Sequence, residues 1–319
     1  MKPPYDITPE ILQLLTEVSE KIGAIHARYL DRPAPQLRKQ NRIRTIHSSL
    51  QIEGNTLNEA QVTAIVENKR VSGPPKDILE VLNAMRVYNR IGKYRPFSEK
   101  SFLAAHRSLM AGLSRNAGTY RKKSVGIVKG SHIQHIAPPA KNIPFLMKDL
   151  FRYLETDPDI PLIKSCVFHY ELEFIHSFMD GNGRMGRLWQ AVILLQSYPV
   201  FEFLPFETLI RHDQDGYYKA LSQSDREGRS TAFIRFMLQI INASLAELLA
   251  GNNRTLNDTD RLAYFASQVK GPFTRKDYMH LFKEISPATA SRDLKKGVEQ
   301  GLFRKSGDKK TTVYITNSY

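Results

Sequence analysis

Apolar residues recur at helical spacing along most of this chain. The first run predicts a helix from Pro9 to about Leu30, with Thr8 at its N-cap. Further runs predict helices over Thr56 to Arg70 (with a Thr56–Glu59 capping box), Asp77 to Ile91, Ser98 to Met110, Asn142 to Tyr153, Pro161 to His176, Leu188 to Leu195 and Thr231 to Leu249. No apolar run is expected to reach membrane-spanning length. The pattern therefore predicts a mainly α protein.

A short stretch in the middle of the chain has strand character instead. Ser124 to Val128 is rich in β-branched residues, and Ser131 to Ile136 alternates between polar and apolar positions. The dipeptide Lys129-Gly130 lies between them, where a tight turn fits. We expect a β-hairpin here.

The C-terminal part of the chain predicts a separate small domain after a linker at Gly251-Asn252-Asn253. A helix over Thr274 to Phe282 is followed by a second helix that Ser286 caps. Two strands follow, over Leu302 to Arg304 and Thr312 to Ile315. Helix, turn, helix and hairpin is the order of a winged helix.

This small domain is basic. Residues 259–319 contain twelve Lys and Arg against six Asp and Glu, a net charge of +6. Five of the basic residues fall on the second helix and the wing: Arg292, Lys295, Lys296, Lys309 and Lys310. DNA is a candidate partner. Winged helices also dock proteins or dimerise, so a homodimer stays open as well.

Composition narrows the class of protein. The chain has 319 residues, enough for two domains, and a net charge of +14 that suits acidic partners such as nucleotides. Its single cysteine, Cys166, excludes an internal disulfide and favours a cytoplasmic location. The N-terminus contains no signal-peptide core, and no membrane partner is expected.

A polar segment, from His176 to Arg187, lies between two apolar stretches that are each predicted to be helical. Its run Gly181-Asn182-Gly183 lies where a helix begins, so unpaired backbone N–H groups point outward at the positive end of a helix dipole. Such a site binds anions, and glycine lets a phosphate approach the backbone. Arg184 and Arg187 lie three residues apart and add planar guanidinium groups suited to phosphate.

Two further residues of this segment indicate phosphate-transfer chemistry. Asp180 would repel a bare phosphate, which a bridging Mg²⁺ explains. His176 stands where a general base could serve an incoming nucleophile. Taken singly, each residue is also typical of an ordinary turn or a packed side chain, and the spacing excludes an EF-hand. Together they make one phosphate-transfer constellation.

A second carboxylate stands out upstream. Ile43, Ile46, Leu50 and Glu53 share one helix face, so Glu53 ends an apolar stripe. It also lies at a helix C-terminus, where the dipole disfavours a negative charge, and Gly54 is the expected stop. This placement predicts a cationic partner elsewhere in the fold.

These residues carry a resemblance to a known family. The segment His176-Ser177-Phe178-Met179-Asp180-Gly181-Asn182-Gly183-Arg184-Met185-Gly186-Arg187 resembles the Fic signature, His-Pro-Phe-x-Asp/Glu-Gly-Asn-Gly-Arg-x-x-Arg. It departs from the pattern at Ser177, where the family's usual proline would stiffen the turn. The resemblance implies a Fic-type helical bundle with a β-hairpin flap. It also implies an N-terminal helical region at 1–95, a catalytic domain at 96–250 and the winged helix at 251–319.

The resemblance implies a role for each signature residue. His176 would be the catalytic base and Asp180 the Mg²⁺ ligand. Tyr218, in a Tyr-Tyr-x-Ala-Leu stretch, would lie near the base of ATP. The nucleotide would contact Gly181, Asn182, Gly183, Arg184, Gly186, Arg187 and Tyr218.

Two more stretches resemble family elements. Ser49 to Asn55 is similar to the inhibitory motif Ser/Thr-x-x-x-Glu-Gly/Asn, which implies that Glu53, with Ser49 and Gly54, keeps Arg187 from the γ-phosphate. The hairpin is similar to the flap that pairs with a target segment, which implies flap roles for Val128, Lys129, Gly130 and Ser131.

The resemblance implies transfer of AMP from ATP to a Ser, Thr or Tyr hydroxyl on a target protein, with self-modification as one outcome. Two alternatives stay open. Glu53 could orient water and remove AMP from a modified protein. The chain could instead be a DNA-binding regulator whose Fic domain only senses ATP.

Overall fold

The computed structural model describes residues 2–29, 35–124, 126–129, 132–251, 258–269, 271–282, 285–308 and 312–317. The chain divides into two compact units, Met1–Leu249 and Ala250–Tyr319. The helices before residue 96 belong to the same unit as those that follow. The fold is mainly α, as the sequence predicts.

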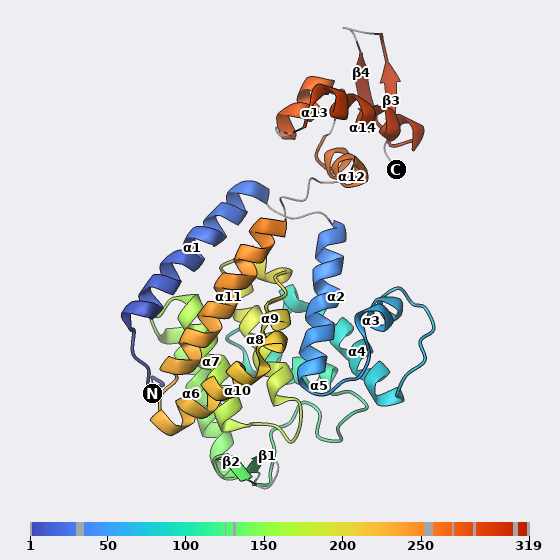
Figure 1. Ribbon diagram of the computed structural model, residues 1–319. Coiled ribbons are helices and arrows are strands. Elements are labelled where there is room, and N and C mark those ends of the chain that lie inside the picture. The colour runs from blue at the N-terminus through green and yellow to red at the C-terminus, as the bar shows by residue number, and fades with distance from the viewer. Residues whose placement is uncertain are drawn as a thin grey trace. The chain divides into compact units, whose positions relative to one another are not determined.

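The first unit is a helical bundle with one hairpin (Figure 1). Its α-helices are α1 (Pro9–Tyr29), α2 (Pro35–Ile52), α3 (Glu59–Val66), α4 (Pro75–Tyr88), α5 (Glu99–Leu109), α6 (Ile143–Thr156), α7 (Pro161–Ile175), α8 (Asn182–Leu195), α9 (Phe206–His212), α10 (Gln214–Glu227) and α11 (Thr231–Gly251). Three 3₁₀ turns join them: η1 (Ile91–Lys93), η2 (Ala140–Asn142) and η3 (Pro199–Glu202).

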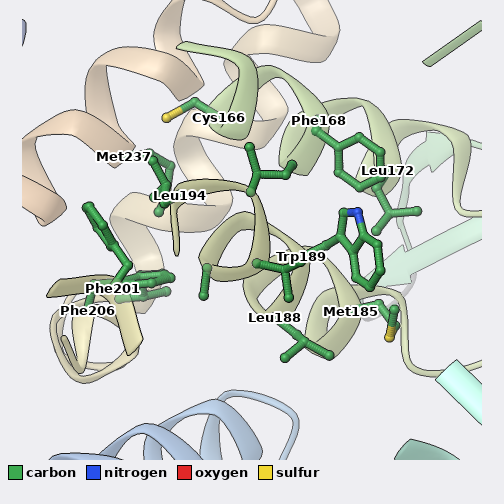
Figure 2. Packing of buried hydrophobic residues seen from close by; sticks show 14 of the residues in the cluster. Cys166, Phe168, Leu172, Met185, Leu188, Trp189, Leu194, Phe201, Phe206 and Met237 are labelled. Carbon is green, nitrogen blue, oxygen red and sulfur yellow. The ribbon is translucent and has the colours of Figure 1, made fainter. Parts of the chain in front are cut away.

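Helix α8 forms the centre of this bundle. Every residue from Asn182 to Leu194 is buried except Gly183. Figure 2 shows Trp189 and Leu188 of α8 among side chains from α7 and from the segment that contains η3 and α9. The indole Nε1 of Trp189 donates to Pro96 O at 3.0 Å. Because α8 is surrounded, its N-terminus has a fixed position, and the polar turn before it is held by the core.

Helix α11 corrects one expectation. By length and composition it is the one helix within the described residues that could span a membrane, whereas the sequence was expected to hold no such run. In this structure 56% of that stretch is buried. Its inner face, with Phe233, Met237 and Ile241, belongs to the bundle core. Its outer face pairs with α1, where Asn242 Nδ2 donates to Glu17 Oε2 at 2.7 Å.

The predicted Thr56–Glu59 capping box is wrong. Helix α3 is capped by Asn58, whose side chain accepts from Gln61 N while Gln61 caps Asn58 in return. Thr56 turns away and donates its hydroxyl to Asp77 Oδ2 at 2.6 Å. The longer-range bond to α4 therefore displaces the local one.

The hairpin consists of β1 (Gly126–Lys129) and β2 (His132–Ile136), paired antiparallel. Gly126 lies opposite Ile136 and Lys129 opposite His132, with a register shift between Ile127 and Val128. This agrees with the predicted hairpin. Gly130 and Ser131, to which the sequence assigns flap roles, lie outside the described residues.

The second unit contains α12 (Asp258–Gln268), α13 (Arg275–Leu281), α14 (Pro287–Glu299), β3 (Phe303–Ser306) and β4 (Val313–Thr316). Strands β3 and β4 pair antiparallel and follow α13 and α14, so helix, helix and hairpin come in the order predicted for a winged helix. Helix α12 is an addition, since the sequence pattern predicts no helix between the linker at Gly251-Asn252-Asn253 and Thr274. Lys309 and Lys310, expected at the wing, lie outside the described residues.

Candidate active site

The polar turn between α7 and α8 is built on two left-handed residues. His176 is the C-cap of α7 with φ 49°, and its N–H donates to Leu172 O at 2.9 Å. Gly181 is the N-cap of α8 with φ 87°. A non-glycine residue in this region is uncommon, so the contacts around His176 must hold it there.

Side-chain bonds close the turn internally. Asn182 Oδ1 accepts from Phe178 N and its Nδ2 donates to Phe178 O, both at 2.9 Å. The side-chain amide of Asn182 therefore holds the turn closed. Ser177 is fully buried, and its carbonyl accepts from Arg121 N at 3.0 Å. These bonds hold the turn where the family's usual proline is missing.

His106 of α5 contacts the same turn and supports it. Its Nδ1 accepts from Gly118 N at 2.8 Å, so Nε2 carries the proton and donates to Asp180 O at 3.0 Å. The ring stacks on Phe178 with centroids 3.5 Å apart. Burial lowers the pKa of His106 to about 4, so the imidazole is neutral and acts as a structural donor.

A pocket of about 290 Å³ opens in front of this turn. Its walls combine the N-terminus of α8 with residues of α7 and α10. It is lined by Glu53, Glu173, Phe174, His176, Met179, Asp180, Gly181, Asn182, Gly183, Arg187, Tyr217, Tyr218, Leu221, Ser222 and Asp225. The structure thus brings the predicted base, acid, glycines and second arginine to one cavity.

Arg187 is held by the C-terminal end of α2. Its Nη2 donates to Glu53 Oε1 at 2.7 Å and to Ser49 O at 2.9 Å, and its Nε donates to Ser49 Oγ at 3.1 Å. Arg187 is fully buried, while the Glu53 side chain is 28% exposed. The cationic partner that the position of Glu53 predicts is therefore Arg187.

Glu53 also covers the beginning of α8. A Cβ placed on Gly183 would lie 2.4 Å from Glu53 Oε1. Only glycine leaves room for the carboxylate there, directly over the first turn of the helix. A carboxylate at a helix N-terminus occupies the place where an anionic ligand would bind.

Arg184 is engaged by two carboxylates. Its Nη1 donates to Glu80 Oε1 of α4 at 3.1 Å, and its Nη2 donates to Asp180 Oδ1 at 2.8 Å. Glu80 is buried and also accepts a hydrogen bond from Asn55 Nδ2 at 2.9 Å. Asn55 lies two residues after Glu53 in the sequence. The end of the α2 segment is thus connected to both arginines of the polar turn. Arg184 itself is not one of the residues that line the pocket.

Two other predicted nucleotide contacts differ in their surroundings. Gly186 does not line the pocket; a Cβ there would lie 2.4 Å from the His169 ring, so glycine permits α8 to approach α7 closely. His169 is buried between Gln190 Oε1 at 2.7 Å and Tyr217 OH at 3.0 Å, as expected for a core residue. Tyr218 does line the pocket.

Glu173 is a pocket residue that the sequence analysis missed. It lies on α7 one turn before His176, and its Oε1 is buried without a hydrogen-bond partner. Burial, followed by the charge of Glu53, raises the pKa of Glu173 to about 8. At neutral pH the pocket therefore contains a protonated carboxyl group next to the Glu53–Arg187 pair.

We expect Glu173→Gln to change the pH dependence of stability. Because folding raises the pKa of Glu173 from 4.5 to about 8, its stabilising contribution is complete below about pH 4.5 and is lost as the pH rises through 8. The Gln variant lacks this loss, so it should gain at least about 1 kcal/mol on wild type between mildly acid and mildly alkaline pH. Urea unfolding across that range measures it, with the exposed Glu155→Gln as control. If the free energy of unfolding changed with pH in the same way in Glu173→Gln and Glu155→Gln, the raised pKa of Glu173 would be contradicted.

The residues that sequence reasoning missed share a readable signal. Glu80 lies on the same face as the buried residues Ala84 and Val87, four and seven positions on. Glu173 lies on the face of His169 and His176. Glu53 was recognised because it is a carboxylate on an otherwise apolar helix face. Glu80 and Glu173 could have been recognised by the same rule. No comparable local signal marks Arg121.

Comparison with known proteins identifies relatives of this chain. The profile of the Fic/DOC family matches residues 96–194. A Nematostella vectensis protein named Protein adenylyltransferase Fic is 30% identical over 276 residues, covering 79% of this chain and 62% of that protein. A Culex quinquefasciatus protein of the same name is 28% identical, covering 72% and 46%. The chain thus spans roughly half to three fifths of the length of these two relatives.

Two solved structures resemble the fold, one over the whole chain and one over about three quarters of it. A crystal structure of a Fic family protein from Desulfovibrio desulfuricans G20 has a TM-score of 0.76 and 38% identity, covering 100% of this chain and 99% of that one. Fic-1 (residues 134–508) from C. elegans has a TM-score of 0.64 at 20% identity, covering 76% and 73%. The second likeness concerns the fold alone.

Proposed function

This chain belongs to the Fic family, and from that premise we propose that it is a protein adenylyltransferase that transfers AMP from ATP to a protein hydroxyl. The observation that carries the proposal is the single cavity that His176, Asp180, Gly183 and Arg187 share. The names of the relatives at about 30% identity support the same activity.

Four of the pocket residues have a direct task in this reaction. His176 accepts the proton of the attacking Ser, Thr or Tyr hydroxyl. The oxygen then attacks the α-phosphorus of ATP, the bond to the β-phosphate oxygen breaks, and pyrophosphate leaves. The first N–H groups of α8, at Asn182 and Gly183, bind phosphate oxygens as charge builds up on them. Tyr218 offers an aromatic face to the adenine.

The residues fit a Mg²⁺ ion held by one protein carboxylate. The Asp180 side chain is 52% exposed and lines the pocket. Within the described residues there is no cluster of three or more metal-ligating side chains. Mg²⁺ is commonly bound through one or two carboxylates plus phosphate oxygens, which this donor set allows. When bound, the ion would compensate charge on the phosphates.

We propose that the resting protein is autoinhibited. The contacts of Glu53 support this, because Nη2 and Nε of Arg187 already donate to Glu53 and Ser49 and are therefore not available to a γ-phosphate. ATP would then bind in an unproductive position.

The same site suggests how a target protein could bind and which second reaction is a candidate. Strand β2 or β1 offers backbone groups to a target segment, as strand addition requires. Glu53 lies in the pocket, so removal of AMP from a modified protein by a water that Glu53 orients is the second candidate. The exposed Arg292 and Lys295 of α14 make DNA a candidate partner of the second unit.

Transfer of label from ATP tests the proposal. The Glu53→Gly protein, supplied with Mg²⁺, is expected to acquire label from α-labelled ATP and none from γ-labelled ATP, because AMP is transferred and pyrophosphate leaves. Label from the γ-position would indicate a kinase and would refute the proposal. Release of AMP from a premodified target, dependent on Glu53, would favour the reverse reaction.

A further inference from the structure

Arg121 is a buried arginine just outside the pocket. It is 2% exposed. Within the described residues, the acceptors of its guanidinium are all backbone carbonyls. Nε donates to His176 O at 2.7 Å, and Nη2 donates to Ile175 O at 3.2 Å and to Pro138 O at 2.7 Å. Nη1 donates to Lys123 O at 2.8 Å. One side chain thus satisfies four carbonyl groups.

The four carbonyls come from two different parts of the site. Ile175 and His176 end α7 and carry the imidazole. Lys123 and Pro138 lie on either side of the β1–β2 hairpin, three residues before its first strand and two residues after its second. The backbone of Arg121 adds a fifth bond, from its N–H to Ser177 O at 3.0 Å. Arg121 therefore connects both ends of the hairpin to the turn that contains His176.

This arrangement depends on a guanidinium group. The last carbonyls of α7 have no intrahelical partner and lie at the negative end of the helix dipole, so a cation is favoured there. Within the described residues, Arg121 forms no ion pair with a carboxylate, and burial lowers its pKa. A planar fork reaches four acceptors in different directions. The ammonium group of lysine is a point charge on a flexible stem and cannot reproduce that geometry.

His176 is the residue that most needs such support. Its φ of 49° is a left-handed conformation that an L-residue rarely adopts, and the turn must hold it against that cost. The Nε bond to His176 O fixes the peptide group that follows this strained residue. The direction of the imidazole is set by the backbone that Arg121 holds.

We infer that Arg121 is a positioning residue that fixes the substrate-binding hairpin relative to the catalytic base. The inference rests on the proposed function for its chemistry. A target segment paired with the hairpin presents its hydroxyl at a position set by Lys123 and Pro138. The imidazole waits at a position set by Ile175 and His176. Since the same guanidinium holds both, it sets the distance between the hydroxyl and its base.

Variants of Arg121 in the Glu53→Gly background test this. Arg121→Lys and Arg121→Met are expected to lower the rate of AMP transfer to protein at least about tenfold, because misplacement of reacting groups is costly. The dissociation constant for ATP should stay within about twofold, since Arg121 does not line the pocket. The exposed Arg115→Met is the matched control and should behave as the parent.

Limited trypsin digestion of the full chain gives a readout without catalysis. Cleavage after Lys122 and Lys123, followed by mass spectrometry, should be faster in both Arg121 variants than in the parent and in Arg115→Met. Arg121→Lys should not restore protection from trypsin. This result would show that the planar guanidinium group is needed and that a positive charge alone is not sufficient. Parental transfer rates and parental cleavage would overturn the inference, as would a transfer defect explained by weaker ATP binding. If the Glu53→Gly parent itself transfers nothing, the proposed function fails, and the digestion still decides whether Arg121 holds the hairpin.

Discussion

Replacing Glu53 with glycine is expected to raise the rate of AMP transfer about a hundredfold, the effect typical of gaining one charged group at a transition state. The reason is geometric. Arg187 is fully buried and its Nη2 is 2.7 Å from Glu53 Oε1, so this nitrogen is not available to a phosphate while Glu53 is present. Removing the carboxylate also clears the first turn of α8 above Gly183. Intact-mass analysis after incubation with ATP and magnesium measures self-modification as added AMP.

A stability measurement accompanies this variant. Without Glu53, the buried Arg187 loses its carboxylate, so the melting temperature should fall and saturating ATP should restore it more than in wild type. Glu67→Gly is the matched control, because Glu67 also follows a helix and pairs with Lys39 and Lys69, but on the surface. Equal transfer rates in wild type and Glu53→Gly would sink the autoinhibition proposal.

Replacing His176 in the Glu53→Gly protein is expected to lower AMP transfer by about 10²- to 10⁴-fold, the usual contribution of a general base. His176 lines the pocket beside the N-terminus of α8. ATP affinity should change little, because the phosphate contacts come from other residues. Alanine at φ 49° carries a backbone cost, so His176→Asn, which tolerates this conformation, is the better-folded companion.

The exposed His212→Ala on α9 is the control for this loss. Transfer should collapse in both His176 variants and persist in His212→Ala, while all three bind ATP. A His176→Asn protein with parental activity would show that another group takes the proton.

Much of this site could be predicted from the sequence, because its parts are local. The polar turn lies between two apolar helices, and Gly181 to Gly183 begins α8 as the pattern indicates. Glu53 ends an apolar stripe, which correctly predicts a cationic partner elsewhere in the fold. Hydrophobic periodicity and helix-end rules depend only on residues that are close in the sequence. The polar turn, the start of α8 and the unfavourable position of Glu53 can all be recognised from such residues.

The rest depends on contacts between distant segments. Arg184 and Glu80 are 104 residues apart in the chain, and Arg121 and His176 are 55 apart. No local pattern states such pairings. The same effect explains the error at α3, where Thr56 bonds to Asp77 across 21 residues and leaves the cap to Asn58.

The proposed reaction requires a triphosphate to lie across the first turn of α8, with its α-phosphorus facing His176. A crystal structure of the Glu53→Gly protein with magnesium and a non-transferable ATP analogue tests it directly. We expect the analogue in the pocket between Gly183 and Tyr218, with Arg187 turned from Ser49 toward its terminal phosphate. An analogue bound in another cavity, with this pocket holding only solvent, would contradict the account.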